Sequence, residues 1–279
     1  MDNTLNAFLR GIIEAATEFL PVSSTGHLFL FSYFFPFNHL TVDHEAFEDL
    51  FDIFIQTGAI LSVVVLYFQV LWKHTKSASL YLIKKTTDNS GFHFYRNLMV
   101  GILPILVLGF VFKNTLDQIK MRPDLLLILG LSWLIGGLIM VFVEMKHYDE
   151  SDGRIIGMKE SIIVGFLQCF ALIPGVSRSA ATIITARTLG VSKKDSAEFS
   201  FFLAIPVLTL AGVYKLYKHR SILNSETIGL LLFGSIVSFV ICYFIIRLFM
   251  AFIRRRSFLS FGIYRILLGI LVILYFVRG

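Results

Sequence analysis

Two carboxylates, several hydroxyls and an imidazole stand together in one otherwise apolar stretch, GIIEAATEFLPVSSTGHL, residues 11–28. Glu14 and Glu18 are four residues apart, so they share one face if the stretch is helical. Two carboxylates side by side in an apolar medium repel each other unless a cation joins them. The pair therefore predicts a metal site or acid–base chemistry; the alternative is a surface amphipathic helix with its glutamates in water.

The residues after Pro21 indicate a site for an anion. A helix that begins near Ser23 presents free backbone N–H groups and the positive end of its dipole, which both attract anions. A hydroxyl at such a position also caps the helix, and we expect one of the three hydroxyls to do so. His27 follows one turn later, either as a structural histidine or as an acid–base partner of the glutamates. The candidate contacts to a substrate in this stretch are Ser23, Ser24, Thr25 and His27.

A second polar cluster, PGVSRSAAT at residues 174–182, also begins at a proline. An arginine in an apolar segment is energetically expensive and favours an anionic partner. The planar guanidinium of Arg178 fits two phosphate oxygens at once. An ion pair with one of the two glutamates, without any ligand, is the alternative. The candidate anion-binding residues here are Ser177, Arg178, Ser179 and Thr182.

The composition places these clusters in a membrane protein. Of the 279 residues, 56% are hydrophobic and 16% are charged, whereas soluble domains have about 45–50% and about 25%. No polar stretch is long enough for a separate soluble domain. We interpret the net charge of +6 as Lys and Arg gathered on one membrane face, and we expect no nucleic-acid partner. The first ten residues lack the features of a cleavable signal peptide.

Six stretches are apolar over the ~20 residues that cross a bilayer. They are residues 50–72, 96–113, 124–143, 196–218, 227–250 and 258–277. Two further apolar stretches, about 5–35 and about 158–189, are broken by LPVSSTG and IPGVSRS, where Pro and Gly stop a helix. Each half is too short to cross. Both stretches therefore predict re-entrant helix–turn–helix hairpins, which a bilayer tolerates only inside protein or beside water.

The distribution of Lys and Arg predicts the orientation. Residues 36–49 contain neither, whereas the next connection contains Lys73, Lys76, Lys84, Lys85 and Arg96. The positive-inside bias then places both termini outside and makes the two hairpins enter from opposite faces. That geometry is an inverted-topology repeat, with repeats at 1–143 and 144–279 in one membrane domain, 1–279. The expected fold class is an all-α polytopic membrane protein with six transmembrane helices and two re-entrant hairpins.

If the two hairpin turns meet, a phosphate group fits between them. Arg178, the hydroxyls and the helix N-termini attract it. A divalent cation bridges it to Glu14 and Glu18, because Mg²⁺ commonly binds one or two carboxylates plus substrate phosphates. Such a cation also stabilises charge on a leaving oxygen. Because the site lies in a bilayer, the remainder of the substrate is expected to be lipid.

The motifs EAATEFLPVSSTGH (14–27) and PGVSRSAAT (174–182) resemble the two signature regions of undecaprenyl-diphosphate phosphatases of the bacitracin-resistance type. FDIFIQTGAI (51–60) and AEFSFFLAIP (197–206) resemble that family's flanking segments. The resemblance implies hydrolysis of the C55 polyprenyl diphosphate to the monophosphate and inorganic phosphate, which recycles the lipid carrier for cell-wall synthesis and confers bacitracin resistance. It also implies a divalent cation, Mg²⁺ or Ca²⁺, and a bacterial inner-membrane protein whose site faces the periplasmic or outer side.

The resemblance also assigns roles to individual residues. Glu14 and Glu18 match the pair that the family uses for metal and catalysis. Ser24 matches the serine favoured as nucleophile, and His27 matches the signature histidine. The diphosphate-binding set is matched by Ser177, Arg178, Ser179 and Thr182.

The sequence leaves several alternatives open. In the mechanism that we expect, Ser24 attacks the terminal phosphorus, and Glu18 or His27 takes its proton. A phosphohistidine on His27 and attack by metal-activated water are the alternatives. A polyprenyl-phosphate flippase or anion transporter is the rival class, since inverted repeats with broken helices are typical of carriers; a Ser/His peptidase fits less well. The expected partners are the lipid substrate, membrane lipids and a possible second copy of the chain in a homodimer.

Overall fold

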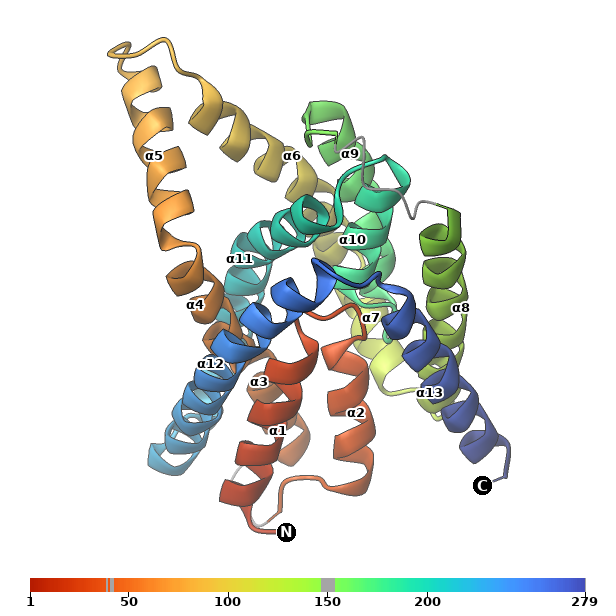
Figure 1. Ribbon diagram of the computed structural model, residues 1–279. Coiled ribbons are helices and arrows are strands. Elements are labelled where there is room, and N and C mark those ends of the chain that lie inside the picture. Colours follow the sequence, from red (N-terminus) through yellow and green to blue (C-terminus); the bar gives the residue numbers. More distant parts are fainter. Residues whose placement is uncertain (39, 41–42, 147–153, 279) are drawn as a thin grey trace.

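The computed structural model describes residues 1–38, 40, 43–146 and 154–278. Within these residues every regular element is a helix (Figure 1), which confirms the all-α fold class. Six helical segments are long and apolar enough to cross a membrane, so the chain is a polytopic membrane protein, as its composition predicted. These segments are His44–Leu66, Ser90–Val111, Leu125–Lys146, Lys193–Lys218, Ser225–Ile253 and Leu259–Arg278.

The first spanning segment consists of two helices, α3 (His44–Phe54) and α4 (Gln56–Leu66), which meet at Ile55. It begins at His44, before the start of the predicted span 50–72. It ends at Leu66, because the helix is interrupted again at Tyr67. The helices outside the two hairpins that complete the fold are α5 (Phe68–Leu82), α6 (Ser90–Val111), α7 (Lys113–Lys120), α8 (Leu125–Lys146), α11 (Lys193–Lys218), η2 (Arg220–Ile222), α12 (Ser225–Ile253) and α13 (Leu259–Arg278). The α5 and α6 helices form the long arm at the top left of Figure 1.

Two pairs of short helices carry the polar clusters. The first pair is α1 (Asn3–Thr17) and α2 (Ser24–Phe34). The second pair is α9 (Met158–Leu167), continued by the 3-10 helix η1 (Gln168–Leu172), and α10 (Arg178–Thr188). None of these helices has the ~20 residues that cross a bilayer. In Figure 1 the first pair opens toward the bottom, the second opens toward the top, and their turns lie near the middle. This arrangement fits the predicted re-entrant hairpins.

The two hairpin turns end in the same way. Ser23 and Ser177 precede α2 and α10, with φ of 77° and 74°. A left-handed backbone at a residue other than glycine costs about 1–3 kcal/mol. Each serine side chain accepts a hydrogen bond from a backbone N–H of the following helix, Gly26 or Ala180, and so caps that helix. The shared geometry supports the predicted repeats 1–143 and 144–279, which stay a prediction.

Close helix contacts around the hairpins depend on glycine. Gly58 of α4 faces the backbone of α12, where a Cβ would lie 2.0 Å from the Ser235 carbonyl oxygen. On α8 and α13, Gly137 and Gly262 lie against each other in the same way, with a Cβ on Gly137 only 2.7 Å from the Gly262 carbonyl oxygen. Small residues let membrane helices approach closely, and van der Waals packing then holds them together.

We expect Gly58→Ala to destabilise the protein, because the added methyl group forces α4 and α12 apart. Overpacking of this kind typically costs about 1–3 kcal/mol. Thermal unfolding of the purified protein in detergent measures the loss. The matched control is Gly229→Ala on α12, where a Cβ meets no atom within 4 Å; it should leave the melting temperature unchanged or slightly raised. Equal melting temperatures for the two variants would contradict the packing described here.

Candidate active site

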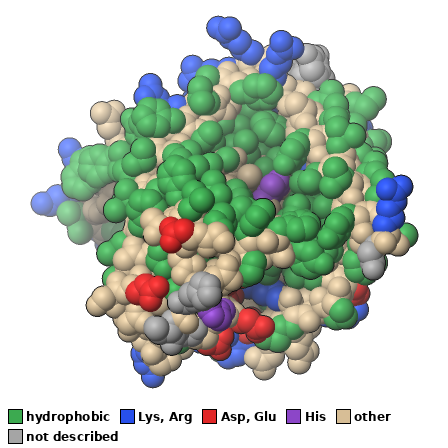
Figure 2. Space-filling view, turned by 90° about the horizontal axis from the view of Figure 1, so that it is seen from below, with side chains coloured by type: hydrophobic (Ala, Val, Ile, Leu, Met, Phe, Trp, Pro, Cys, Tyr) green, Lys and Arg blue, Asp and Glu red, His purple; other side chains and the backbone are tan. Residues whose placement is uncertain are grey.

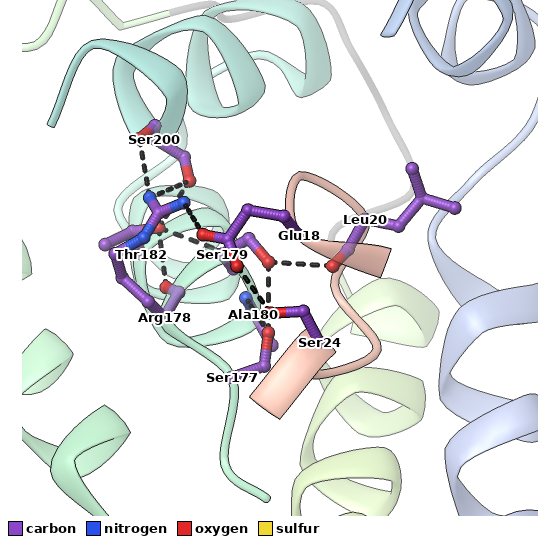
Figure 3. A network of polar contacts seen from close by, with 9 residues as sticks. All are labelled: Glu18, Leu20, Ser24, Ser177, Arg178, Ser179, Ala180, Thr182 and Ser200. Carbon is purple, nitrogen blue, oxygen red and sulfur yellow. Dashed lines mark hydrogen bonds and ion pairs between the residues drawn. The ribbon is translucent and has the colours of Figure 1, made fainter. Parts of the chain in front are cut away.

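The two hairpin turns are in direct contact (Figure 3). Arg178 Nη2 lies 3.0 Å from Glu18 Oε1, and the two side chains are only 9% and 7% exposed. Ser179 Oγ donates a hydrogen bond to the Leu20 carbonyl oxygen at 2.8 Å. The expected meeting of the two clusters is therefore found, and so is the ion pair between arginine and glutamate that the sequence left open as an alternative.

Ser24 completes the environment of Glu18. Its hydroxyl donates to Glu18 Oε2 at 2.5 Å, and the side chain is buried. Glu18 thus receives a serine hydroxyl on one oxygen and a guanidinium on the other. A hydroxyl in hydrogen-bond reach of a carboxylate is the arrangement of a nucleophile with its general base. Of the two proton acceptors predicted for Ser24, the geometry favours Glu18 over His27.

A residue of α11 fixes the orientation of Arg178. Ser200 is fully buried; its carbonyl oxygen accepts from Arg178 Nη1 at 2.8 Å, and its hydroxyl accepts from Thr182 at 2.8 Å. Within the described residues, Arg178 Nε is buried without a hydrogen-bond partner, so the guanidinium retains a free donor. The sequence analysis missed Ser200. Its only signal was a serine among the phenylalanines of AEFSFF.

Glu14 is a site carboxylate that forms no ion pair with a basic side chain among the described residues. It is fully buried, and neither of its oxygens has a hydrogen-bond partner in the described part of the chain. It interacts electrostatically with Glu18 and Asp52, which are negative, and with Arg178. A buried charge without compensation is strongly unfavourable. A cation or a proton must therefore accompany Glu14.

The donor set can be compared with what a divalent cation requires. The described residues contain no group of three or more His, Cys, Asp or Glu side chains placed to hold a metal. Mg²⁺ nevertheless binds commonly through one or two carboxylates, completed by water and substrate phosphate oxygens. The free oxygens of Glu14, with Glu18 one turn away, fit that mode. They do not fit a site built from protein ligands alone.

Both ring nitrogens of His27 have hydrogen-bond partners other than Ser24. Its Nδ1 lies 2.6 Å from the Ser23 carbonyl oxygen, and its Nε2 lies 2.7 Å from the hydroxyl of Tyr264 on α13. The ring also packs edge-to-face on Trp133 of α8 at 5.3 Å between centroids. Trp133 and Tyr264 lie on spans far from His27 in the sequence, and no local pattern connects them with it.

Arg265 of α13 holds both turns at once. It is fully buried and donates to the carbonyl oxygens of Pro21 at 3.2 Å, Gly175 at 3.2 Å and Ser132 at 3.1 Å. A Cβ at position 136 would lie 2.3 Å from Arg265 Nη2, so Gly136 provides the space for this guanidinium. An arginine inside a membrane span is a signal of function or special structure. The sequence shows an arginine within this apolar segment but not the carbonyl oxygens that it binds.

The remaining predicted hydroxyls differ in how they are used. Ser23 and Ser177 cap α2 and α10, and Ser177 Oγ lies 3.0 Å from Ser179 Oγ. Thr182 donates to its own helix and to α11. Thr25 is exposed beside the turn.

The face of the molecule at the bottom of Figure 1 has a hollow in its middle, where a histidine side chain is visible among hydrophobic side chains (Figure 2).

The fold and the site define a polytopic membrane protein with a buried carboxylate, hydroxyl and guanidinium gathered from two opposed turns. A model of the family described as "Bacitracin resistance protein BacA" matches residues 7–271, and the chain belongs to this family. The resemblance seen in the two motifs is thereby confirmed.

Proteins named undecaprenyl-diphosphatase are similar to the chain over its whole length. One from Leptospira biflexa serovar Patoc is 83% identical over 278 residues, covering 100% of both chains. One from Leptospira borgpetersenii serovar Hardjo-bovis is 55% identical and covers 99% of this chain and 98% of the relative. A more distant relative from Flavobacterium psychrophilum is 39% identical and covers 98% and 95%.

We expect Arg265→Met to destabilise the protein by about 2–6 kcal/mol, because the carbonyl oxygens of Pro21 and Gly175 lose their donor and each unpaired group costs about 1–3 kcal/mol. Thermal unfolding in detergent gives the change in stability. Arg278→Met, at the exposed end of the same helix, is the matched control and should melt like the unmodified protein. If both variants melt alike, Arg265 does not tie the two turns together.

Proposed function

We propose that this chain hydrolyses undecaprenyl diphosphate to the monophosphate and inorganic phosphate. The observation that carries the proposal is the buried contact of Ser24 with Glu18, which is paired in turn with Arg178 of the opposite hairpin. The printed name of the relatives, undecaprenyl-diphosphatase, supports the same reaction. This activity recycles the lipid carrier for cell-wall synthesis and confers bacitracin resistance.

In the proposed mechanism Ser24 is the nucleophile. Glu18 Oε2 accepts the proton of the hydroxyl, and Ser24 Oγ attacks the terminal phosphorus. The bond from that phosphorus to the bridging oxygen breaks, and the polyprenyl monophosphate leaves with the bond's electron pair. Water then attacks the phosphorus of the phosphoserine, and the bond from phosphorus to Ser24 Oγ breaks. Glu18 returns its proton to Ser24 Oγ, and the protons of the water leave with inorganic phosphate. A phosphohistidine on His27 and direct attack by water are the alternatives.

The second hairpin binds the anionic oxygens in this proposal. Arg178 has a free Nε donor, and its ion pair with Glu18 gives way to contacts with phosphate when the substrate arrives. The helices α2 and α10 begin at the two turns that are in contact, and the positive dipole end of a helix N-terminus favours an anion. The hydroxyls of Ser177 and Ser179 lie at the start of α10, where a developing negative charge is stabilised by donors already in position.

The proposed cofactor is a divalent cation, Mg²⁺ or Ca²⁺, held by Glu14 and Glu18. The unpartnered oxygens of Glu14 support it. When bound, such a cation neutralises charge on phosphate oxygens and on the leaving oxygen. It also removes the repulsion that two carboxylates would otherwise exert on a diphosphate.

The proposed location is the bacterial inner membrane, with both termini and the site's hollow on the outer side. The α5–α6 connection with Lys84 and Lys85 lies at the top of Figure 1, and both termini lie at the bottom. The run Arg254–Arg256 precedes α13, one span away from the C-terminus. The positive-inside bias supports this orientation. A homodimer stays a prediction.

We expect the purified protein in detergent to release phosphate from a polyprenyl diphosphate when Mg²⁺ is present. Ser24→Ala and Glu18→Gln should each lower the rate at least about a hundredfold, because they remove the nucleophile and its base. Glu226→Gln, an exposed carboxylate on α12, is the control and should keep full activity.

Two further outcomes of this assay discriminate the alternatives. Phosphate trapped on Ser24 supports the proposed nucleophile. Phosphate trapped on His27 would instead indicate a phosphohistidine, and phosphate on neither residue would indicate direct attack by water. An unmodified protein that releases no phosphate, yet moves lipid across liposomes, would instead be a flippase or anion transporter.

We expect chelation of divalent cations to abolish phosphate release and added Mg²⁺ or Ca²⁺ to restore it. Glu14→Gln removes one anionic ligand but keeps the shape of the side chain. It should raise the metal concentration for half-maximal activity about tenfold or more, because even the loss of a residue that supports a metal ligand typically lowers metal affinity about 10–100-fold. Titration of activity with metal measures the shift, and an unchanged midpoint would assign Glu14 a role without metal.

A further inference from the structure

The hydrogen bonds of His27 define which of its nitrogens carries a proton. Nδ1 faces the Ser23 carbonyl oxygen at 2.6 Å. A carbonyl oxygen only accepts, so Nδ1 donates its hydrogen. In the neutral imidazole Nε2 is then the acceptor. Nε2 lies 2.7 Å from the Tyr264 hydroxyl, which therefore donates to it.

Aromatic contacts fix the plane of the same ring. The Tyr264 and His27 rings are nearly parallel, with an interplanar angle of 7° and centroids 5.8 Å apart. Trp133 packs against the imidazole at 61°, and its Nε1 donates to the Val22 carbonyl oxygen at 3.0 Å. The imidazole is thus held on one side by the turn itself and on the other by two spans, α8 and α13.

The remaining polar groups of the turn have other partners. The hydroxyl of Ser24 donates its hydrogen bond to Glu18. For His27 to reach Ser24, its ring would have to give up the bonds to Ser23 and Tyr264. The hydrogen-bond partner of Nε2 is the hydroxyl of Tyr264, a residue that is 43% exposed.

We propose that Tyr264 is a positioning residue for His27 in the proposed hydrolysis. Its hydroxyl holds Nε2 as an acceptor, and its ring keeps the imidazole aligned beside the Ser23–Ser24 turn. Ser24 and Glu18 carry out the chemistry, so His27 acts by holding the Ser23–Ser24 turn through Nδ1, and Tyr264 acts through His27. The proposal rests on the proposed function, and it adds a residue that lies outside both signature motifs.

Tyr264→Phe tests the proposal, because it removes only the hydroxyl and keeps the stacked ring. In phosphate-release assays on the full chain, kcat should fall about fivefold, since a lost hydrogen bond corresponds to about 1 kcal/mol, while KM stays within about twofold. Tyr275→Phe is the matched control. It lies on the same helix, is 45% exposed, and contacts Tyr33 and Phe34; both constants should equal those of the unmodified protein.

A double-mutant comparison separates positioning from a direct role. In a His27→Ala background, Tyr264→Phe should have no further effect, because Tyr264 acts through the imidazole. If the two losses multiply, or if Tyr264→Phe alone keeps full kcat, the proposal is overturned. Release of no phosphate by the unmodified protein would instead remove the proposed function.

A spectroscopic measurement tests the contact without any substrate. Imidazole ¹⁵N signals of His27, assigned by their loss in His27→Ala, should show a protonated Nδ1 and a hydrogen-bonded, unprotonated Nε2. In Tyr264→Phe the Nε2 signal should shift, and in Tyr275→Phe it should not. An Nε2 signal that is identical in all three proteins would overturn the assignment.

Discussion

The rest of the site depends on the two contacts that the Glu18 carboxylate makes. One of its oxygens accepts from Ser24 of its own hairpin, and the other pairs with Arg178 of the opposite hairpin. Buried charges are tolerated only with partners, so neither turn can bury its charged group alone. The capped helices α2 and α10, the glycine contacts of the surrounding spans and the guanidinium of Arg265 all keep these two turns at contact distance.

The fold followed from the sequence because bilayers permit few solutions. Apolar runs near 20 residues have to span, and runs broken at Pro21 and Pro174 could not. The ends of the elements were less well predicted. No Gly or Pro marks the interruption at Tyr67, so the sequence predicts one span over 50–72 although α5 begins at Phe68. No Gly or Pro separates the short helix α7 from the span before it, so the sequence does not predict α7 as a separate element.

The site was predicted where its residues are close in sequence, as in 14–27 and 174–182. Spacings of three and four residues fix which side chains share a helical face. Ser200, Trp133 and Tyr264 reach the site from other spans, and no local pattern connects them to it. Arg265 was visible as a charge in a span, but its three carbonyl partners are set by tertiary packing alone.

The position of Arg265 has a consequence for how the protein is made. The helix that carries it, α13, follows both turns in the chain, so the turns are synthesised before it. While the ribosome is still adding α13, the carbonyl oxygens of Pro21 and Gly175 have no guanidinium to bind. Assembly of this site therefore waits for α13, and until that helix is in place the carbonyl oxygens of the two turns need another donor, such as water.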